Sequence, residues 1–188
     1  MAKQIWKPGN MLYPVPAVMV TTSDGRGRDN IITIAWAGTI NSEPPMVSVS
    51  VRKSRYSHEL LSQSGEFVIN LVTKDLAYAM DYCGVRSGRD VDKFAEMKLT
   101  KGKASTVSVP IIEESPLNIE CKVKQVLELG SHDMFIAEVT SVLADEKYID
   151  ENGKFELNKS GLIAYSHGLY FTLGECVGKF GYSVQKKK

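Results

Sequence analysis

The chain of 188 residues is 43% hydrophobic and 24% charged, a balance that predicts one globular domain spanning residues 1–188. Its 23 basic and 22 acidic residues leave a net charge of +1, which argues against nucleic acid or a membrane surface as a partner. No apolar run approaches the roughly 20 residues of a membrane span, and Met1–Asn10 lacks the apolar core of a secretion signal. We therefore expect a cytoplasmic protein.

The first strands are predicted from two apolar, β-branched runs. Val15–Thr22 and Asn30–Ala37 flank the turn-rich segment Ser23–Asp29, which indicates a β-hairpin at the start of the fold.

The clearest strand pattern follows Pro44–Pro45. In Val47–Arg52 the three valines face one way, while Ser48, Ser50 and Arg52 face the other. This alternation predicts a strand with one buried face.

A helix is predicted directly after that strand. Ser57–Ser64 has helical character, with Ser54 or Ser57 as its N-cap and Gly65 just past its end. Phe67–Val72 then reads as another strand.

Thr73 is expected to cap a second helix that runs through Cys83 and stops at Gly84. The polar segment Arg86–Pro116 predicts a loop with one helical turn at Asp92–Met97.

The last predicted strands are Leu117–Lys124 and Met134–Leu143, which are joined by a turn at Gly130–Asp133. A further hairpin turn is expected at Asp150–Gly153, and Lys186–Lys188 is expected to be a solvated end. Several strands with only short helices between them predict a mainly β fold, a closed or nearly closed antiparallel barrel.

The three cysteines are Cys83, Cys121 and Cys176, and no two of them form a C-x-x-C pair. We therefore predict reduced, mostly structural thiols and no metal site.

Polar residues gather where the alternating strand leads into the first helix. Ser50 and Arg52 share the polar strand face, and Arg55, Tyr56 and Ser57 follow within one turn of the helix N-terminus. Hydroxyls, guanidinium groups and unpaired backbone N–H groups at one corner suit a phosphate monoester. The alternative is that the arginines are simply solvated.

The second strand of the opening hairpin is rich in small residues. Thr33, Ala35, Ala37 and Gly38 would let a flat ring approach the backbone closely.

A series of short segments then carries a resemblance, in this order: Thr33–Gly38, Glu43–Pro45, Ser50–Ser57, Gly65–Asn70, Tyr82–Gly84, Asp92–Phe94, Ser115–Cys121 and His167–Tyr170. Together they resemble the flavin reductase-like proteins of the FMN-binding split-barrel fold, especially the flavoredoxin and ferric reductase subgroup.

The resemblance implies an antiparallel split β-barrel of Greek-key type that forms a homodimer and binds flavin mononucleotide (FMN) near the subunit interface. It implies that the flavin ring lies on Thr33, Ala35, Trp36, Ala37 and Gly38, and that the phosphate lies at Ser50, Arg52, Arg55, Tyr56 and Ser57. Val51 is expected to be a further cofactor-binding residue. Trp36 either lines the flavin or packs in the dimer interface.

The resemblance also assigns His167, which precedes Gly168, to a place near the nicotinamide and flavin rings. The alternative is an ordinary hydrogen-bonded histidine, and His58 and His132 are assigned mostly to that class.

Cys83 and Gly84 are expected near the flavin by the same resemblance. Cys83 either tunes the ring or is only a buried small hydrophobe. Lys93 either supports the phosphate or pairs with an acid.

The implied function is an FMN-binding oxidoreductase, namely an NAD(P)H-dependent flavin or ferric reductase that transfers hydride from NADH or NADPH to flavin. No G-x-G-x-x-G motif is present for a Rossmann domain. One alternative is a flavoredoxin-type electron carrier, and another is a barrel that has lost its cofactor. The expected partners are small redox substrates or redox proteins.

Overall fold

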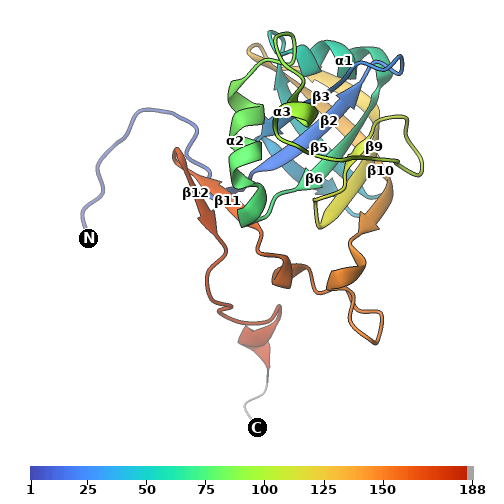
Figure 1. Cartoon of the computed structure of the whole chain (residues 1–188). Coiled ribbons are helices and arrows are strands. Elements are labelled where there is room, and N and C mark those ends of the chain that lie inside the picture. The colour runs from blue at the N-terminus through green and yellow to red at the C-terminus, as the bar shows by residue number, and fades with distance from the viewer. Residues whose placement is uncertain (186–188) are drawn as a thin grey trace.

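The computed structural model describes residues 1–185, and the Lys186–Lys188 tail lies outside this range. Its centre is a seven-stranded antiparallel sheet in the order β3-β2-β6-β9-β10-β5-β4 (Figure 1). Its strands are β2 (Val18–Ser23), β3 (Asp29–Ile34), β4 (Ala37–Asn41), β5 (Met46–Arg52), β6 (Glu66–Leu71), β9 (Leu117–Glu128) and β10 (His132–Ala144). The predicted mainly β, antiparallel fold is confirmed.

The two edge strands of this sheet are neighbours in the chain. Only Ala35 and Trp36 separate β3 from β4, so the sheet has to curl until its edges approach one another. The backbone N–H of Ser50 donates to the carbonyl oxygen of Trp36 at 2.9 Å, which ties the crossing to β5. The prediction of one continuous strand over Asn30–Ala37 is therefore wrong, because the chain leaves β3 here to reach the opposite edge.

The interior of the barrel is filled by side chains from most of its strands. Val47, Val49 and Val51 of β5 pack there with Phe67 and Phe135. The predicted alternation of β5 is thus confirmed, and its opposite face is left for polar residues.

The helices are α1 (Tyr56–Ser64), α2 (Ala77–Val85) and α3 (Lys93–Glu96), with 3-10 helices at Lys74–Leu76, Glu146–Tyr148, Leu157–Ser160 and Tyr182–Val184. A second apolar cluster holds α2 and α3 on the sheet, and it includes Met19, Ile31, Met80, Cys83 and Phe94. Within residues 1–185, no helix is long and apolar enough to cross a membrane.

Only the N-terminal end of α1 differs from the prediction. Gly65 ends the helix in the left-handed conformation, with φ of 67°, as predicted. The N-cap position belongs to Arg55, which makes no side-chain cap bond, so the prediction of Ser54 or Ser57 is wrong. Ser57 is fully buried, and its hydroxyl points inward instead.

The region of α2 also differs in detail. Thr73 precedes the first 3-10 helix without a side-chain cap bond, and α2 runs through Gly84 rather than stopping there. The predicted turn at Asp92–Met97 is confirmed as α3, because the Asp92 carboxylate accepts from the backbone N–H groups of Phe94 and Ala95.

Two small sheets lie outside the barrel. One pairs β1 (Val15–Pro16), β11 (Ile163–Ser166) and β12 (Leu169–Thr172), and the other pairs β7 (Lys101–Gly102) with β8 (Ile111–Ile112). The two terminal segments extend away from the barrel (Figure 1).

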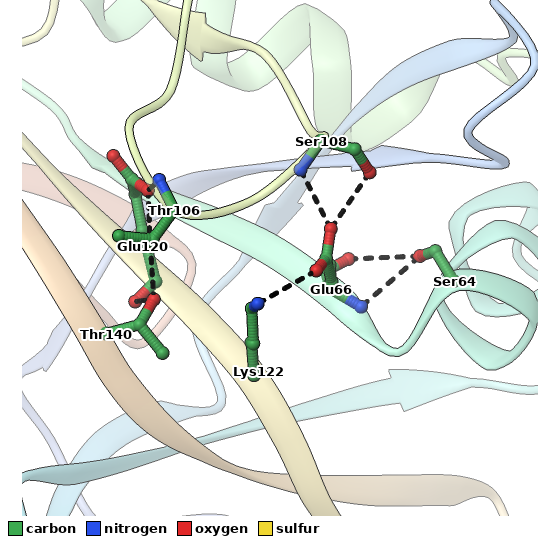
Figure 2. Close-up of polar contacts among 7 residues, drawn as sticks. All are labelled: Ser64, Glu66, Thr106, Ser108, Glu120, Lys122 and Thr140. Atoms are coloured by element: carbon green, nitrogen blue, oxygen red, sulfur yellow. Dashed lines mark hydrogen bonds and ion pairs between the residues drawn. The ribbon is translucent and has the colours of Figure 1, made fainter.

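Two carboxylates fasten the loop that follows β7 to the barrel wall (Figure 2). Glu120 is fully buried and accepts four hydrogen bonds from the backbone and hydroxyl groups of Ser105 and Thr106. On β6, the neighbour of β9 in the sheet, Glu66 accepts hydrogen bonds from the N–H and the hydroxyl of Ser108, at 2.8 and 2.9 Å. The loop is therefore held by polar contacts as well as by apolar packing.

Candidate functional site

Three residues of the predicted anion corner, Arg55, Tyr56 and Ser57, line a cavity of about 160 Å³ between the start of α1 and the end of α2, whereas Ser50 and Arg52 line a neighbouring cavity. We call the first cavity the anion pocket, and its lining residues are Asn30, Ile32, Ser54, Arg55, Tyr56, Ser57, Cys83, Gly84, Arg86, Ser87, Gly88 and Lys93. Segments far apart in the sequence meet here, and most of them present polar groups.

Ser57 is prepared as a hydrogen-bond donor to this pocket. Its oxygen accepts from the Thr22 hydroxyl at 3.0 Å and from the Asn30 carboxamide at 2.9 Å. A hydroxyl has two acceptor lone pairs and one proton. Since both lone pairs are used, the Ser57 proton is available for a ligand in the anion pocket.

Lys93 is a buried cation that also lines the pocket. Its Nζ donates to the carbonyl oxygens of Ile31 and Cys83, at 2.6 and 2.7 Å. Burial, reinforced by the positive charge of Arg55, lowers the pKa of Lys93 to about 8. Within the described residues no carboxylate pairs with this ammonium group, so an anion in the pocket would be its charge partner.

The N-terminus of α1 adds backbone donors. The first N–H groups of a helix have no acceptor one full turn earlier in the helix, and Arg55 at the N-cap position makes no side-chain cap bond to them. Arg55 stands at this end, and the Arg89 guanidinium lies 5.1 Å from the ring of Tyr56 while donating to the Ser54 carbonyl oxygen. These groups favour a negative charge at this end of the helix.

Two glycines allow the close approach that builds the pocket. A Cβ on Gly88 would lie 2.0 Å from Oδ1 of Asn30, and a Cβ on Gly84 would lie 3.1 Å from Cβ of Thr33. A side chain at position 88 would therefore collide with Asn30 as it is placed, and one at position 84 would press against Thr33 of β3.

A second cavity, of about 150 Å³, continues from the anion pocket along the split between β3 and β5. The two share Ile32 and Arg55. We call the second cavity the ring groove, and its other lining residues are Thr33, Ile34, Ala35, Trp36, Ser50, Val51, Arg52 and His132.

The structure brings most of the predicted cofactor residues together. The ring groove contains Thr33, Ala35, Trp36, Ser50, Val51, Arg52 and Arg55, and the anion pocket contains Arg55, Tyr56, Ser57, Cys83 and Gly84. Ala37 and Gly38 line neither cavity, because they already belong to β4.

His167 lies apart from both cavities. It is exposed at the turn between β11 and β12. Its ring meets the ring of Tyr13 edge to face, with 5.9 Å between the ring centroids. The ring centroids of Tyr13 and Trp36 lie 6.3 Å apart. A nicotinamide or flavin contact by His167 stays a prediction.

Residues 11–173 match the family described as Flavin reductase like domain. The chain belongs to this family.

Similar solved structures support the fold of this flavin reductase-like chain. Flavoredoxin of Desulfovibrio vulgaris (Miyazaki F) is similar with a TM-score of 0.90 and 31% identity, over 98% of this chain and 100% of that one. The FMN-binding protein from Thermus thermophilus, solved with bound 1-cyclohex-2-enone, has a TM-score of 0.78 and 27% identity, over 95% and 98% of the two chains. The expected split-barrel fold is confirmed.

Among curated sequences, an uncharacterized protein of Archaeoglobus fulgidus is 30% identical over 161 residues, which cover 86% of this chain and 89% of that protein. This flavin reductase-like chain thus matches its relative over nearly the full length of both.

Two residues of the site in this flavin reductase-like chain, Asn30 and Gly88, are not predicted by the sequence, and the sequence predicts no specific partner for Lys93. Asn30 lies in a strand and Gly88 in a polar loop, so neither carries a local signal. Cys83 is buried, and burial raises the pKa of its thiol to about 11, which favours its interpretation as a small hydrophobe.

The histidines assigned to ordinary roles differ from each other. Nε2 of His58 lies 2.7 Å from the buried carboxylate of Asp133 and so fixes α1 to β10. His132 instead lines the ring groove. No group of three or more His, Cys, Asp or Glu side chains suited to a metal occurs within residues 1–185.

Proposed function

We propose that this flavin reductase-like protein binds FMN, with the phosphate in the anion pocket and the isoalloxazine ring in the ring groove. The observation that carries the proposal is Lys93, a buried cation that lines the anion pocket and whose partners among residues 1–185 are carbonyl oxygens. A phosphate monoester carries about two negative charges, which would compensate Lys93 and Arg55 together. The pocket residues therefore fit this group.

The protein's own groups would hold and orient the ligand. Lys93 and the Ser57 hydroxyl would donate to phosphate oxygens, and the uncapped N-terminus of α1 would supply backbone N–H groups. Trp36 and the backbone beside it would bound the ring. Bound FMN supplies electron or hydride transfer chemistry that side chains lack.

The activity that we propose is reduction of flavin, or of a ferric complex, with NADH or NADPH as the hydride donor. Membership in the flavin reductase-like family supports it. Small carbonyl compounds are a further class of ligand that we propose, since the Thermus thermophilus relative was solved with bound 1-cyclohex-2-enone.

A visible spectrum of the FMN-loaded protein tests both steps. Without oxygen, NADH or NADPH is expected to bleach the flavin absorption, and steady-state assays with free FMN or a ferric complex should show turnover. A protein that takes up no FMN would contradict the binding proposal. A loaded protein that neither nicotinamide nucleotide reduces would contradict the reductase proposal.

The second candidate is a flavoredoxin-type electron carrier between partner proteins. Its support is the 31% identity to flavoredoxin of Desulfovibrio vulgaris over nearly all of both chains. Rapid reduction by a ferredoxin or a hydrogenase, together with negligible reduction by NADH and NADPH, would favour this function over the first.

We propose in addition that the protein is a homodimer. Both terminal segments carry exposed apolar side chains, among them Ile5, Trp6, Leu12, Phe171, Val177 and Phe180. Exposed apolar surface of this kind marks interaction sites, and the segments extend from the barrel where a second copy could cover them (Figure 1). Light scattering is expected to give twice the monomer mass, and the mass of one chain would contradict the proposal.

A further inference from the structure

A line of four aromatic rings leads from the ring groove to the small sheet that contains β11 and β12. Trp36 lines the ring groove. The centroid of its ring lies 6.3 Å from that of Tyr13, the centroids of Tyr13 and Tyr165 are 5.7 Å apart, and those of Tyr165 and Tyr170 are 5.8 Å apart. Each separation falls within the range of about 4.5 to 7 Å for aromatic rings in contact. We call these four side chains the aromatic path.

Backbone pairing fixes the middle of the aromatic path. Tyr165 of β11 lies directly opposite Tyr170 of β12 and, on its other side, opposite Val15 of β1. Directly opposed residues of paired strands have their Cβ atoms about 4.5 to 5.5 Å apart, so the two tyrosine rings are held in contact. Tyr13 lies two residues before Val15 and extends the path to Trp36.

The outer end of the aromatic path has a base beside it. The Tyr170 hydroxyl donates a hydrogen bond to a carboxylate oxygen of Asp81 on α2, at 2.8 Å. Partial burial and this hydrogen bond raise the pKa of Tyr170 to about 12, so the phenol keeps its proton at neutral pH. Of the tyrosines on the path, Tyr170 is the one whose hydroxyl is hydrogen-bonded to a base among residues 1–185. A base at this distance can accept the phenol proton.

We propose that the aromatic path carries one-electron oxidation away from the ring groove, from Trp36 to Tyr170, and so protects the site from oxidative damage. The oxidant would be a peroxide-derived radical that forms where reduced flavin meets oxygen. The inference rests on the proposed function for this source of the oxidant, whereas the path itself consists of the chain's own side chains.

Electrons and protons balance along the aromatic path. The oxidant takes one electron from the indole of Trp36, whose ring N–H proton passes to water. The indole radical then regains one electron, supplied by Tyr170 through the rings of Tyr165 and Tyr13, and one proton from water. Tyr170 gives its phenol proton to the Asp81 carboxylate. The net result is a phenoxyl radical at Tyr170 and an intact Trp36.

The place of Tyr170 at the surface lets the oxidation end there. At neutral pH a neutral phenoxyl radical is more stable than an indole radical, so the oxidation settles on Tyr170. Tyr170 is 41% exposed, whereas Tyr13 and Tyr165 are half-buried. A soluble thiol or ascorbate therefore reaches Tyr170, returns one hydrogen atom to its phenoxyl oxygen and is itself oxidised by one electron. Asp81 then releases its proton to water.

Pulse radiolysis of the full chain without FMN tests the aromatic path itself. Azide radicals oxidise indole rings, and Trp6 and Trp36 are the two tryptophans of the chain. The parent protein for the experiment therefore carries Trp6→Phe, a change at an exposed position of the N-terminal segment. We expect the absorption of the indole radical to decay as that of the phenoxyl radical rises, at a rate independent of protein concentration.

The deciding variant is Tyr170→Phe, which keeps the ring and removes the hydroxyl that donates to Asp81. It is expected to lose the rapid conversion of indole radical to phenoxyl radical. Tyr13→Leu, which removes the ring in contact with Trp36, should lose it as well. The matched control is Tyr78→Phe, at an exposed tyrosine of α2 outside the aromatic path, and it should convert as the parent does. Equal conversion in Tyr170→Phe and the parent, or a rate that rises with protein concentration, would overturn the proposal.

A second measurement separates the protective role from the proposed function. The FMN-loaded protein is taken through repeated cycles of reduction by dithionite and reoxidation in air, and oxidised Trp36 is measured by peptide mass spectrometry. More oxidised Trp36 is expected in Tyr170→Phe than in Tyr78→Phe, and equal amounts would overturn the protective role. A protein that takes up no FMN would contradict the proposed function, whereas the radiolysis of the FMN-free chain would still decide the aromatic path.

Discussion

The carboxamide of Asn30 donates a hydrogen bond to the Ser57 hydroxyl at 2.9 Å, and both side chains are buried. This contact joins β3 to the first turn of α1. It also occupies one of the two lone pairs of the Ser57 oxygen, and the Thr22 hydroxyl occupies the other. The direction of the Ser57 proton is thereby fixed by residues that do not themselves need to touch the ligand.

Ser57→Ala should therefore weaken FMN binding. It removes one donor to the phosphate, and hydrogen bonds to charged groups contribute about 1.5–3 kcal/mol, so the dissociation constant should rise about tenfold to hundredfold. Fluorescence quenching of FMN measures this. Ser64→Ala, at the other end of α1, is the control and should bind FMN normally. Equal affinities for wild type and Ser57→Ala would contradict the assigned role.

Lys93→Met should reduce FMN affinity by at least about tenfold, since it removes a charged donor from the anion pocket. The methionine keeps a similar length and an apolar stem, so the variant is expected to fold and to be more stable than the wild type without FMN. The reason is that the buried ammonium of Lys93 is paired with carbonyl oxygens and with no carboxylate among residues 1–185. Lys101→Met, whose exposed side chain pairs with Asp29, should bind FMN as the wild type does.

The same lysine predicts a pH dependence of stability in the FMN-free protein. The folded-state pKa of Lys93 is about 8 against an ordinary 10.5, so the unfolded chain binds more protons between these values. The contribution of Lys93 to the free energy of unfolding should therefore rise with pH from 8 to 10.5 and be lost as pH falls through 8. Urea unfolding of the wild type and of Lys93→Met at each pH measures this contribution as the difference between their free energies of unfolding. Other groups titrate alike in both proteins and cancel in the difference. A difference that stays constant over this range would contradict the prediction.

The sequence predicts correctly those elements whose structure depends on neighbouring residues in the chain. The valines of β5 point inward because strand side chains alternate, and Gly65 ends α1 because its φ of 67° favours glycine. The same alternation placed Ser50 and Arg52 on the opposite face, at the ring groove.

Long-range pairing set the features that local patterns missed. Asn30 donates a hydrogen bond to Ser57, and Lys93 donates one to the carbonyl oxygen of Ile31. Both contacts form because α1 and α3 pack near β3. No residue spacing in the sequence predicts this packing. Ser57 was expected to cap α1, but its hydroxyl is used by tertiary contacts. The break at Trp36 arises from closure of the barrel, which local strand propensity does not report.

Glu120→Gln should destabilise the protein without affecting FMN binding, since Glu120 lines neither cavity of the site. A carboxamide cannot accept all the hydrogen bonds that Ser105 and Thr106 donate to Glu120 (Figure 2 draws those from Thr106). We expect a loss of about 2–3 kcal/mol in the free energy of unfolding at neutral pH.

The effect of Glu120→Gln should depend on pH. Burial would raise the pKa of Glu120, but the hydrogen bonds from Ser105 and Thr106 lower it below its ordinary 4.5. The stabilisation by the carboxylate is therefore present above pH 4.5 and lost as pH falls through the lower, folded-state pKa. Denaturant unfolding should show the wild type and variant converging in acid. Glu66→Gln, on a partly exposed carboxylate, should have a smaller effect, and an equal effect would contradict this account.

Gly88→Ala should disturb the site through Asn30. The new Cβ would lie 2.0 Å from Oδ1 of Asn30, and the buried carboxamide cannot yield without leaving Ser57. We expect FMN affinity to fall at least about tenfold and stability to fall by about 1–3 kcal/mol. Gly174→Ala is the control, because a Cβ there meets nothing within 4 Å.

A double variant tests whether Gly88→Ala acts through Asn30 or by disturbing the loop in general. In an Asn30→Ala background the side chain that obstructs residue 88 is gone, so adding Gly88→Ala should change FMN affinity and stability little further. Calorimetry and FMN titration on the four proteins of this cycle give the coupling energy between the two positions. Additive effects would mean that Gly88 acts independently of Asn30. A large coupling would show that the glycine is required because it leaves room for the side chain that orients Ser57.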